Sequence, residues 1–292
     1  MKTTNYDTTQ SDQWPAFAGL RHNRRVTHVE TGAMLSSGSI ANRQSSIENE
    51  SAFTIVELLT VIAIIGILAA ILLPALSAAK AHAMKTQARL QAQDIVTAIQ
   101  NYDSAYSRFP VSKGVQQAAG GDEFTYGGSV LAPFTPGTIP AIFTTNNSEV
   151  IAILMDFTNY PDGSGPTANV NYQKNPQQTV FLNAKMAIDT NSAGVGPDLV
   201  YRDPWGNPYV ISMDFDEDNQ VQDAFYRRHT VSQQNGPTGY NGLVNTKDPA
   251  GNTDDFSYHG DVMVWSAGPD KTVDPTKAAD QGANLDNILS WQ

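Results

Sequence analysis

The longest apolar run of the chain lies in its N-terminal third. Residues 58–73 (LLTVIAIIGILAAILL) contain no charged side chain, and the apolar character reaches back to Phe53. From Phe53 to Leu73 is 21 residues, or ~31 Å of α-helix, which matches the hydrocarbon core of a bilayer. Glu57 is the only ionisable residue in this run. We predict a membrane-spanning helix over residues 53–76.

Beyond this run the pattern stays helical but becomes amphipathic. Apolar side chains recur at spacings of three and four and form one stripe, made of Ala88, Ala92, Ile95, Ile99, Tyr102 and Tyr106. Pro110 disfavours helical geometry in the residue before it, so we expect the helix to end at Ser107–Arg108. The result is a rod of ~80 Å that is kinked at Pro74. Lys80, Lys85 and Arg89 follow the apolar run, on the side where the usual orientation rule expects few positive charges.

The remaining residues, 107–292, are predicted to form an α+β head. Glu149–Phe157 has apolar residues at helical spacing behind Ser148, a candidate N-cap. Three stretches have the pattern of strands and are separated by turn-rich segments: Thr179–Leu182, Pro208–Phe215 and Asp261–Ser266. Two longer and more polar segments, 111–148 and 222–259, are interpreted as surface insertions.

Charge restricts the partners of this head. The net charge is −11, and residues 1–52 carry as many basic as acidic groups, so the acidic excess lies in 53–292. A nucleic-acid-binding surface needs a basic face, and we therefore expect no nucleic-acid partner. Hard cations such as Ca²⁺ remain compatible with this charge. The chain has no cysteine, so packing or a metal, rather than a disulfide, has to stabilise the head.

Two alternatives explain the apolar run less well. A secretory signal peptide would use Ala81-His82-Ala83 as its cleavage site, and a plain membrane anchor would need no processing at all. Some 50 residues precede the run, the run exceeds the usual ~7–15 residues of a signal peptide, and a carboxylate lies at its entrance. These features favour a third interpretation.

The segment Ala52-Phe53-Thr54-Ile55-Val56-Glu57 resembles the prepilin peptidase site of type IV pilins and type II secretion pseudopilins. If Phe53 is the first mature residue, then Glu57, Gly66 and Pro74 occupy positions where that family commonly has Glu, Gly and Pro. Ala52 replaces the usual Gly before the cut. The resemblance implies cleavage after Ala52 by prepilin peptidase, methylation of Phe53, and assembly into a filament.

The leader departs from the family pattern in its length and charge. It spans residues 1–52, and Glu48 and Glu50 lie near the cut, where basic residues are usual. A start at Met34 would leave a 19-residue leader that keeps Arg43. The sequence leaves both starts open.

Three positions of the helix are candidates for assembly. Glu57 lies one helical turn from the amine that cleavage creates at Phe53, and the resemblance implies that it pairs with the amine of a neighbouring subunit. The alternative places Glu57 at the level of the lipid headgroups. Gly66 permits the close approach of another helix, and Pro74 introduces the kink.

Two further segments resemble the major pseudopilin. Residues 102–110 (YDSAYSRFP) resemble its helix exit, and residues 203–209 (DPWGNPY) resemble a segment of its head. The second is two proline-directed turns that feed a strand, with Trp205 available to anchor the core. We interpret it as a structural turn.

The C-terminal residues 265–291 resemble the calcium loop of the same subunit. Calcium takes six to eight oxygen ligands, and the resemblance implies Asp270 and Asp286 as the first ligands, with Asp274 and Asn287 next. Asp280 is a spare candidate. An acidic, solvated loop without metal is the alternative.

Two short motifs are rejected. Residues 214–219 (DFDEDN) imitate the start of an EF-hand loop, but Asn219 replaces the required Gly and Phe225 the required Glu, so a polar hairpin turn is expected there. Residues 120–124 (GGDEF) match the diguanylate cyclase signature without convincing buried strands on either side. No catalytic motif is present in the sequence, and we expect no enzyme.

The sequence therefore predicts a leader (1–52), an N-terminal helix (53–106, membrane-spanning over 53–76) and a periplasmic head (107–292) in a type IV pilin-like α+β fold. The resemblance implies a type II secretion pseudopilin in the bacterial inner membrane. Its partners would be prepilin peptidase, an inner-membrane assembly platform, minor pseudopilins and further copies of itself. The alternatives are a type IV pilin for adhesion, motility or DNA uptake, a membrane-anchored enzyme, and a ligand-binding module.

Overall fold

The computed structural model describes residues 53–120, 122–134 and 139–292. Met1–Leu58 forms one unit and Leu59–Gln292 the other. The leader, Ala52 and the alternative start at Met34 lie outside the described residues.

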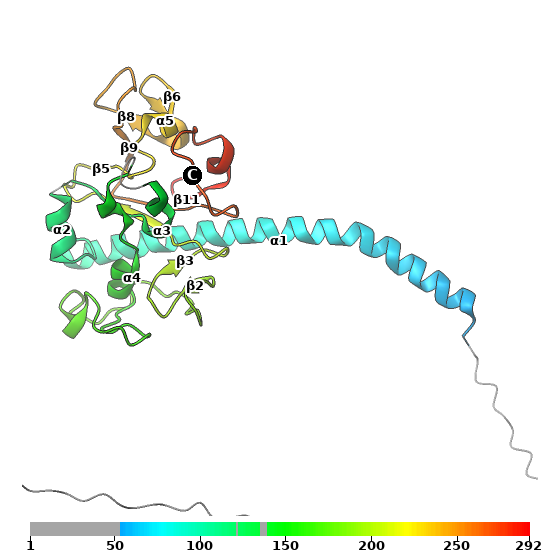
Figure 1. The fold of residues 1–292 in the computed structure, drawn as a ribbon. Helices are drawn as coiled ribbons and strands as arrows, with labels where there is room; N and C mark the ends of the chain where they lie inside the picture. Colours follow the sequence, from blue (N-terminus) through cyan, green and yellow to red (C-terminus); the bar gives the residue numbers. More distant parts are fainter. Residues whose placement is uncertain (1–52, 121, 135–138) are drawn as a thin grey trace, which may run out of the picture. The chain divides into compact units, whose positions relative to one another are not determined.

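One long helix, α1 (Ile55–Tyr106), dominates the chain (Figure 1). It continues without interruption through Pro74, and Figure 1 shows it curving in its N-terminal half. A proline inside a helix removes one hydrogen bond and bends the helix without ending it when the flanking residues are strong helix formers. Within the described residues, α1 is the one helix long and apolar enough to cross a membrane.

The two halves of α1 differ in burial. Its buried residues all belong to the predicted stripe or lie beside it: Ala88, Ala92, Ile95, Ala98, Ile99 and Tyr102. The stripe packs on the head. The side chains of the apolar run, in contrast, are exposed from Phe53 to Leu76, apart from the half-buried Ala69.

The central sheet of the head has four antiparallel strands in the order β1-β4-β10-β11. Their bounds are β1 Phe124–Tyr126, β4 Val210–Met213, β10 Val262–Ser266 and β11 Ile288–Leu289. β10 pairs with β4 in the register Val264 to Ile211 and Trp265 to Val210. The expected strands at 208–215 and 261–266 are thus confirmed, and the α+β fold with them.

Smaller elements surround this sheet. A five-stranded sheet has the order β5-β9-β8-β7-β6, and β2 pairs with β3. The strands are β2 Gly194–Val195, β3 Tyr201–Arg202, β5 Gln220–Val221, β6 Gln233–Asn235, β7 Thr238–Gly239, β8 Val244–Asn245 and β9 Phe256–His259. The short helices are α2 Lys113–Ala119, α3 Gly128–Leu131, α4 Ser148–Leu154 and α5 His229–Ser232.

The central sheet separates two hydrophobic cores. On β4 and β10, Ile211 and Val264 face the core that contains the stripe of α1. The alternate residues Val210 and Trp265 face a second core, because successive side chains of a strand point to opposite faces. The sheet is therefore covered on both faces.

The second core shows that the segment 222–259 is more than a surface insertion. Phe225, Tyr226, Val231 and Phe256 are buried in it and pack with Trp265. Segment 111–148 likewise supplies β1, which pairs with β4. The expectation of two surface insertions was wrong, because strands of two to four residues leave almost no alternating pattern to recognise.

Three local expectations were also wrong. Residues 179–182 form no strand, because Phe181 and Leu182 both donate their N–H groups to the carbonyl of Leu154 (2.8 and 3.0 Å) instead of to a ladder. Ser148 is the first helical residue of α4, which ends at Leu154; its N–H donates to Oδ1 of Asn146 (3.1 Å). Trp205 is only half-buried and belongs to neither core.

The stripe of α1 carries a large share of the stability of the head. We expect Ile95→Ala to lower the free energy of unfolding by about 3 kcal/mol, because the buried side chain leaves a cavity in the first core. Leu90→Ala removes a similar volume from a side chain that is 56% exposed and is expected to cost less than about 1 kcal/mol. Denaturant unfolding followed by tryptophan fluorescence measures both changes. Equal losses in the two variants would show that the stripe is not a core contact.

Candidate functional site

The helix α1 begins with a capping box. The N–H and the hydroxyl of Thr54 donate to Oε2 of Glu57 (2.9 and 2.8 Å), and the N–H of Glu57 donates to the hydroxyl of Thr54 (3.2 Å). This reciprocal pair satisfies N–H groups that have no partner inside a helix. Phe53 precedes the box and is 75% exposed. Ala52, the other side of the expected cut, lies outside the described residues.

Gly66 and Pro74 lie in the exposed half of α1. A Cβ atom added at Gly66 would meet no other atom within 4 Å, so this glycine is not needed for packing within the chain. The large side chains around the two residues are almost all apolar and exposed. A surface of this kind cannot stay in contact with water and requires a bilayer or other helices.

The C-terminal loop brings Asp270 close to Asp286, and Asn287 lines the same hollow as Asp286. Burial and, next, the charge of Asp270 raise the pKa of Asp286. Oδ1 of Asp286 and Oδ1 of Asn287 are both buried without a hydrogen-bond partner, while Nδ2 of Asn287 donates to the hydroxyl of Tyr226 (2.9 Å). Two buried acceptor oxygens without donors, next to a further carboxylate, fit a hard cation.

The other two candidates have different partners. Oδ1 of Asp274 accepts the N–H and the hydroxyl of Thr276 (2.8 and 2.6 Å), and these bonds lower the pKa of Asp274. Asp280 lies beside Tyr240, whose pKa is raised by burial and by the charge of Asp280. Asp274 therefore shapes the loop through a turn.

The turn at residues 203–209 holds the start of this loop. The buried carboxylate of Asp203 accepts the N–H of Asn207 (2.8 Å) and the hydroxyl of Ser266. The side chain of Asn207 donates to the carbonyl of Gly268 (2.7 Å). Gly268 has a φ of 70°, and a Cβ there would lie 2.3 Å from the carbonyl oxygen of Asp286. The turn and this glycine thus set how closely the two ends of the loop approach.

The same turn also contacts α1. The hydroxyl of Tyr209 donates to the carbonyl of Ala88 (3.1 Å) and lies 2.9 Å from Oε1 of Gln91. At the other end of the stripe, Tyr102 donates to the carbonyl of Lys174 (2.6 Å) and Tyr106 to Oδ1 of Asn175 (2.7 Å). Hydrogen bonds therefore fix the head to both ends of the packed part of the helix.

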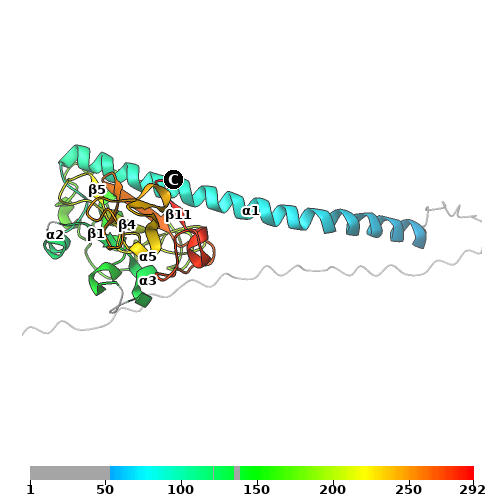
Figure 2. The same cartoon turned by 90° about the horizontal axis from the view of Figure 1, so that it is seen from above.

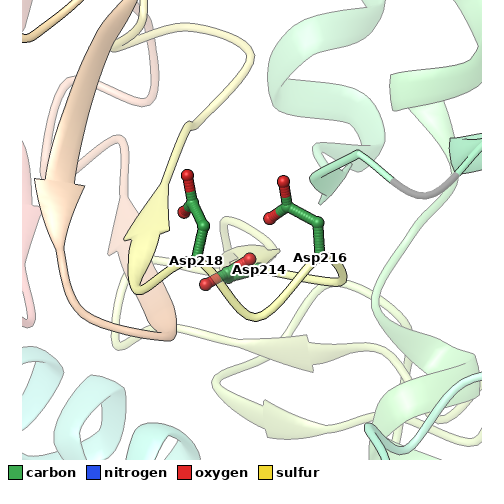
Figure 3. Close-up of side chains that lie close together, drawn as sticks. All are labelled: Asp214, Asp216 and Asp218. Atoms are coloured by element: carbon green, nitrogen blue, oxygen red, sulfur yellow. The ribbon is translucent and has the colours of Figure 1, made fainter.

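Another acidic cluster lies between β4 and β5. Carboxylate oxygens of Asp214, Asp216 and Asp218 come within 4.8 Å of one another, and Figure 3 shows Asp216 and Asp218 rising side by side from one turn. Burial, and then the hydrogen bond and charge of Asp216, raise the pKa of Asp214 to about 6. The EF-hand-like pattern of this segment did not indicate that its three carboxylates come close together.

The segment is a connection between two sheets. The expected hairpin was wrong, since β4 pairs with β1 and β10, whereas β5 pairs with β9. Asp214 accepts the N–H groups of Glu217 (3.0 Å) and Asn219 (2.8 Å), and Asn219 adopts a φ of 64°. Asn is one of the residues that tolerate this left-handed backbone.

One reason for rejecting the cyclase signature also needs correction. Phe124–Tyr126, which begins at the last residue of the signature, is a buried strand of the central sheet. The polarity of Thr125 concealed it; its hydroxyl lies 2.9 Å from that of Ser212 on the adjacent strand and accepts the N–H of Ala224 (2.9 Å). Gly121, within the signature, lies outside the described residues.

Comparison with known proteins identifies the N-terminal segment. Residues 48–73 match the family model of the prokaryotic N-terminal methylation motif. No curated protein and no solved structure matches the chain. The motif, the long apolar helix and the α+β head are together consistent with a type IV pilin-like prepilin. The motif implies processing by prepilin peptidase and assembly into a filament, and it indicates a structural subunit.

The motif predicts one cut. We expect N-terminal sequencing to find Phe53 as the first residue when the full chain is expressed with prepilin peptidase, and no such product without it. Because a small residue precedes the cut and Gly is usual there, Ala52→Gly should be cleaved at least as fast as the native chain, and Ala52→Glu should not be cleaved. A mature chain that begins at any other residue contradicts this assignment.

Proposed function

We propose that this chain is a pseudopilin of a type II secretion system, of the major-subunit type, which builds a short periplasmic filament that supports the export of folded proteins. The observation that carries the proposal is the methylation motif at residues 48–73 on a helix with two different halves. The first half exposes apolar side chains and the second packs on the head. A subunit that polymerises through its helix and presents its head outside the membrane needs both halves.

Features of the head favour secretion over adhesion, motility or DNA uptake. The turn at 203–209 and the loop at 265–291 both resemble the major pseudopilin, and hydrogen bonds from Asn207 and Ser266 join the two segments. The head lacks disulfides, and its acidic charge disfavours contact with DNA.

The function lies in assembly. Prepilin peptidase cuts before Phe53, the new amine is methylated, and an inner-membrane assembly platform extracts the subunit. Glu57 then pairs with the amine of a neighbouring subunit, and this pairing favours the correct register because a charge pair is stronger in apolar surroundings. In the isolated chain the same carboxylate is held by Thr54, so the pairing exchanges one partner for another. The head lies in the periplasm, and minor pseudopilins complete the filament.

Deletion of the gene tests the proposal. We expect the deletion strain to retain proteins that the host normally exports, and the native chain to restore export. Glu57→Ala should reach the membrane but fail to restore export or to form filaments, because the register-setting charge is lost. The surface variant Glu217→Ala is the matched control and should restore both.

Two results would contradict the proposal. Normal export together with the loss of surface pili in the deletion strain would establish the type IV pilin alternative. Filaments formed normally by Glu57→Ala would overturn the assembly mechanism.

We further propose that the C-terminal loop binds Ca²⁺ through Asp270, Asp286 and Asn287. The two buried oxygens without donors, Oδ1 of Asp286 and Oδ1 of Asn287, support these ligands. Calcium would neutralise the repulsion between the two carboxylates and order a loop that has no disulfide. Asp274 contributes to the shape of this loop, because its carboxylate accepts the N–H of Thr276 in a turn.

Calcium is expected to raise the melting temperature of the chain, and a chelator to lower it again. Asp286→Asn should abolish the increase, whereas Asp216→Asn, in the other acidic cluster, should keep it.

Because the pKa of Asp286 is raised in the fold, its ionisation lowers stability as the pH rises through that pKa. Without calcium, Asp286→Asn should therefore be neutral or stabilising at pH 7. The calcium effect should weaken at pH 5, where protons compete with the ion. If the chelator leaves the melting temperature unchanged, the proposed calcium site is wrong.

A further inference from the structure

One histidine and two cationic side chains lie on one face of α1 just beyond the apolar run. His82, Lys85 and Arg89 are spaced by three and four residues and therefore share a helix face, and all three are exposed. From Leu58 to Gln93 the helix contains no acidic residue. This stretch is basic in a chain whose net charge is −11.

The C-terminal loop of the head lies against this basic face. A hollow of about 320 Å³ is lined by His82, Lys85 and Arg89 on one side and by Leu285, Asp286 and Asn287 on the other. Leu285 belongs to the 3₁₀ turn η5 (Gly282–Asp286) and is 69% exposed. Within the unit Leu59–Gln292, Figures 1 and 2 both show this part of the chain on the side of the head from which the apolar half of α1 leaves.

The distance along the helix places this face at a membrane surface. A helix rises 1.5 Å per residue, so Lys80 lies about 6 Å, His82 about 9 Å and Lys85 about 13 Å beyond Leu76, the end of the predicted span. The headgroup layer is about 5–7 Å thick on each side, and a lysine side chain extends along the helix toward it. His82 and Lys85 are thus within reach of lipid phosphates, or within about one Debye length of them. Arg89, about 20 Å beyond Leu76, is the most distant of the three.

We propose that His82, Lys85 and Arg89, together with Leu285, form a juxtamembrane face that rests the head on the phosphate headgroups of anionic lipids while the subunit is in the membrane. Charge complementarity carries the choice of occupant, because basic residues beside a membrane span are attracted to anionic lipid by about 1 kcal/mol each. Asp286 is the one acidic residue that lines the hollow.

This contact would hold the head at a defined height before extraction. Leu285 adds an exposed apolar side chain beside the basic residues. On assembly, the face has to leave the lipid, so the contact opposes extraction until the filament supplies other neighbours. The inference rests on the proposed placement of α1 in a membrane.

The absence of cysteine makes the test direct, because one introduced cysteine can be labelled alone. The full chain carrying Leu285→Cys with an environment-sensitive fluorophore is reconstituted in vesicles whose lipids bear a nitroxide on the headgroup. In a chelator, we expect about threefold stronger quenching with about 30% phosphatidylglycerol than with phosphatidylcholine alone. High salt should remove the difference.

Matched variants separate the basic face from total charge. Lys85→Gln with Arg89→Gln should reduce quenching to the phosphatidylcholine level, while Lys113→Gln with Lys185→Gln, the same charge change elsewhere on the head, should leave it intact. A label at Gln116→Cys, on the exposed surface of α2, should not be quenched in either lipid. Circular dichroism of each variant confirms that the fold is kept.

Several results would overturn the proposal. Equal quenching in both lipids, or equal loss in the two double variants, would exclude a specific basic contact. The label could instead become more shielded as the protein-to-lipid ratio rises, with no dependence on anionic lipid. That result would show that a second copy covers this face. If the chain fails to float with vesicles at all, the membrane placement in the proposed function fails as well; if it floats without quenching, only the juxtamembrane face is wrong.

Discussion

The structure depends on a single helix that has to be stable in two surroundings. The first half of α1 carries apolar side chains on every side and buries none of them, while the second half buries only the stripe from Ala88 to Tyr102. Helix formation satisfies the backbone in both places, so the same secondary structure serves in lipid and against the head. What changes is the pattern of side chains, and that change decides where the head begins.

The head is built to hold that stripe on one side of a thin sheet. A sheet of four short strands has little stability alone, and here both of its faces are covered. The buried carboxylate of Asp223 joins the layers: it accepts from Ser212 on β4 (2.7 Å), from Trp265 on β10 (3.0 Å) and from the N–H groups of Phe225 and Tyr226 (both 2.9 Å). Burial raises its pKa, and these four donors are what makes a buried acid tolerable.

Sequence patterns predicted the elements that have many residues and missed those held by single contacts. The helix, β4 and β10 were found because apolar residues recur over several turns or alternate beside a turn. The strand at Phe124–Tyr126 and the layer around Phe225 were missed, because their stability comes from contacts between residues far apart in the chain. Residues 179–182 have the composition of a strand, but the N–H groups of Phe181 and Leu182 donate to the carbonyl of Leu154. The candidate ligands Asp270, Asp286 and Asn287 were suggested by the resemblance to the calcium loop of the major pseudopilin. The sequence could not show that the carboxylate of Asp274 accepts a hydrogen bond from Thr276.

The turn at residues 203–209 explains how one short segment can mark a fold. Asp203 and Asn207 form hydrogen bonds with Ser266 and Gly268, at the start of the C-terminal loop. Tyr209 donates a hydrogen bond to the carbonyl of Ala88 in α1. The loop and the basic face of α1 are therefore positioned by the same seven residues. In the proposed orientation, these positive charges lie on the outer side of the membrane span, against the usual orientation rule, and such an arrangement has to be stabilised by something else. The turn places those charges beside the loop of the head, so whatever binds the basic face acts on the loop as well.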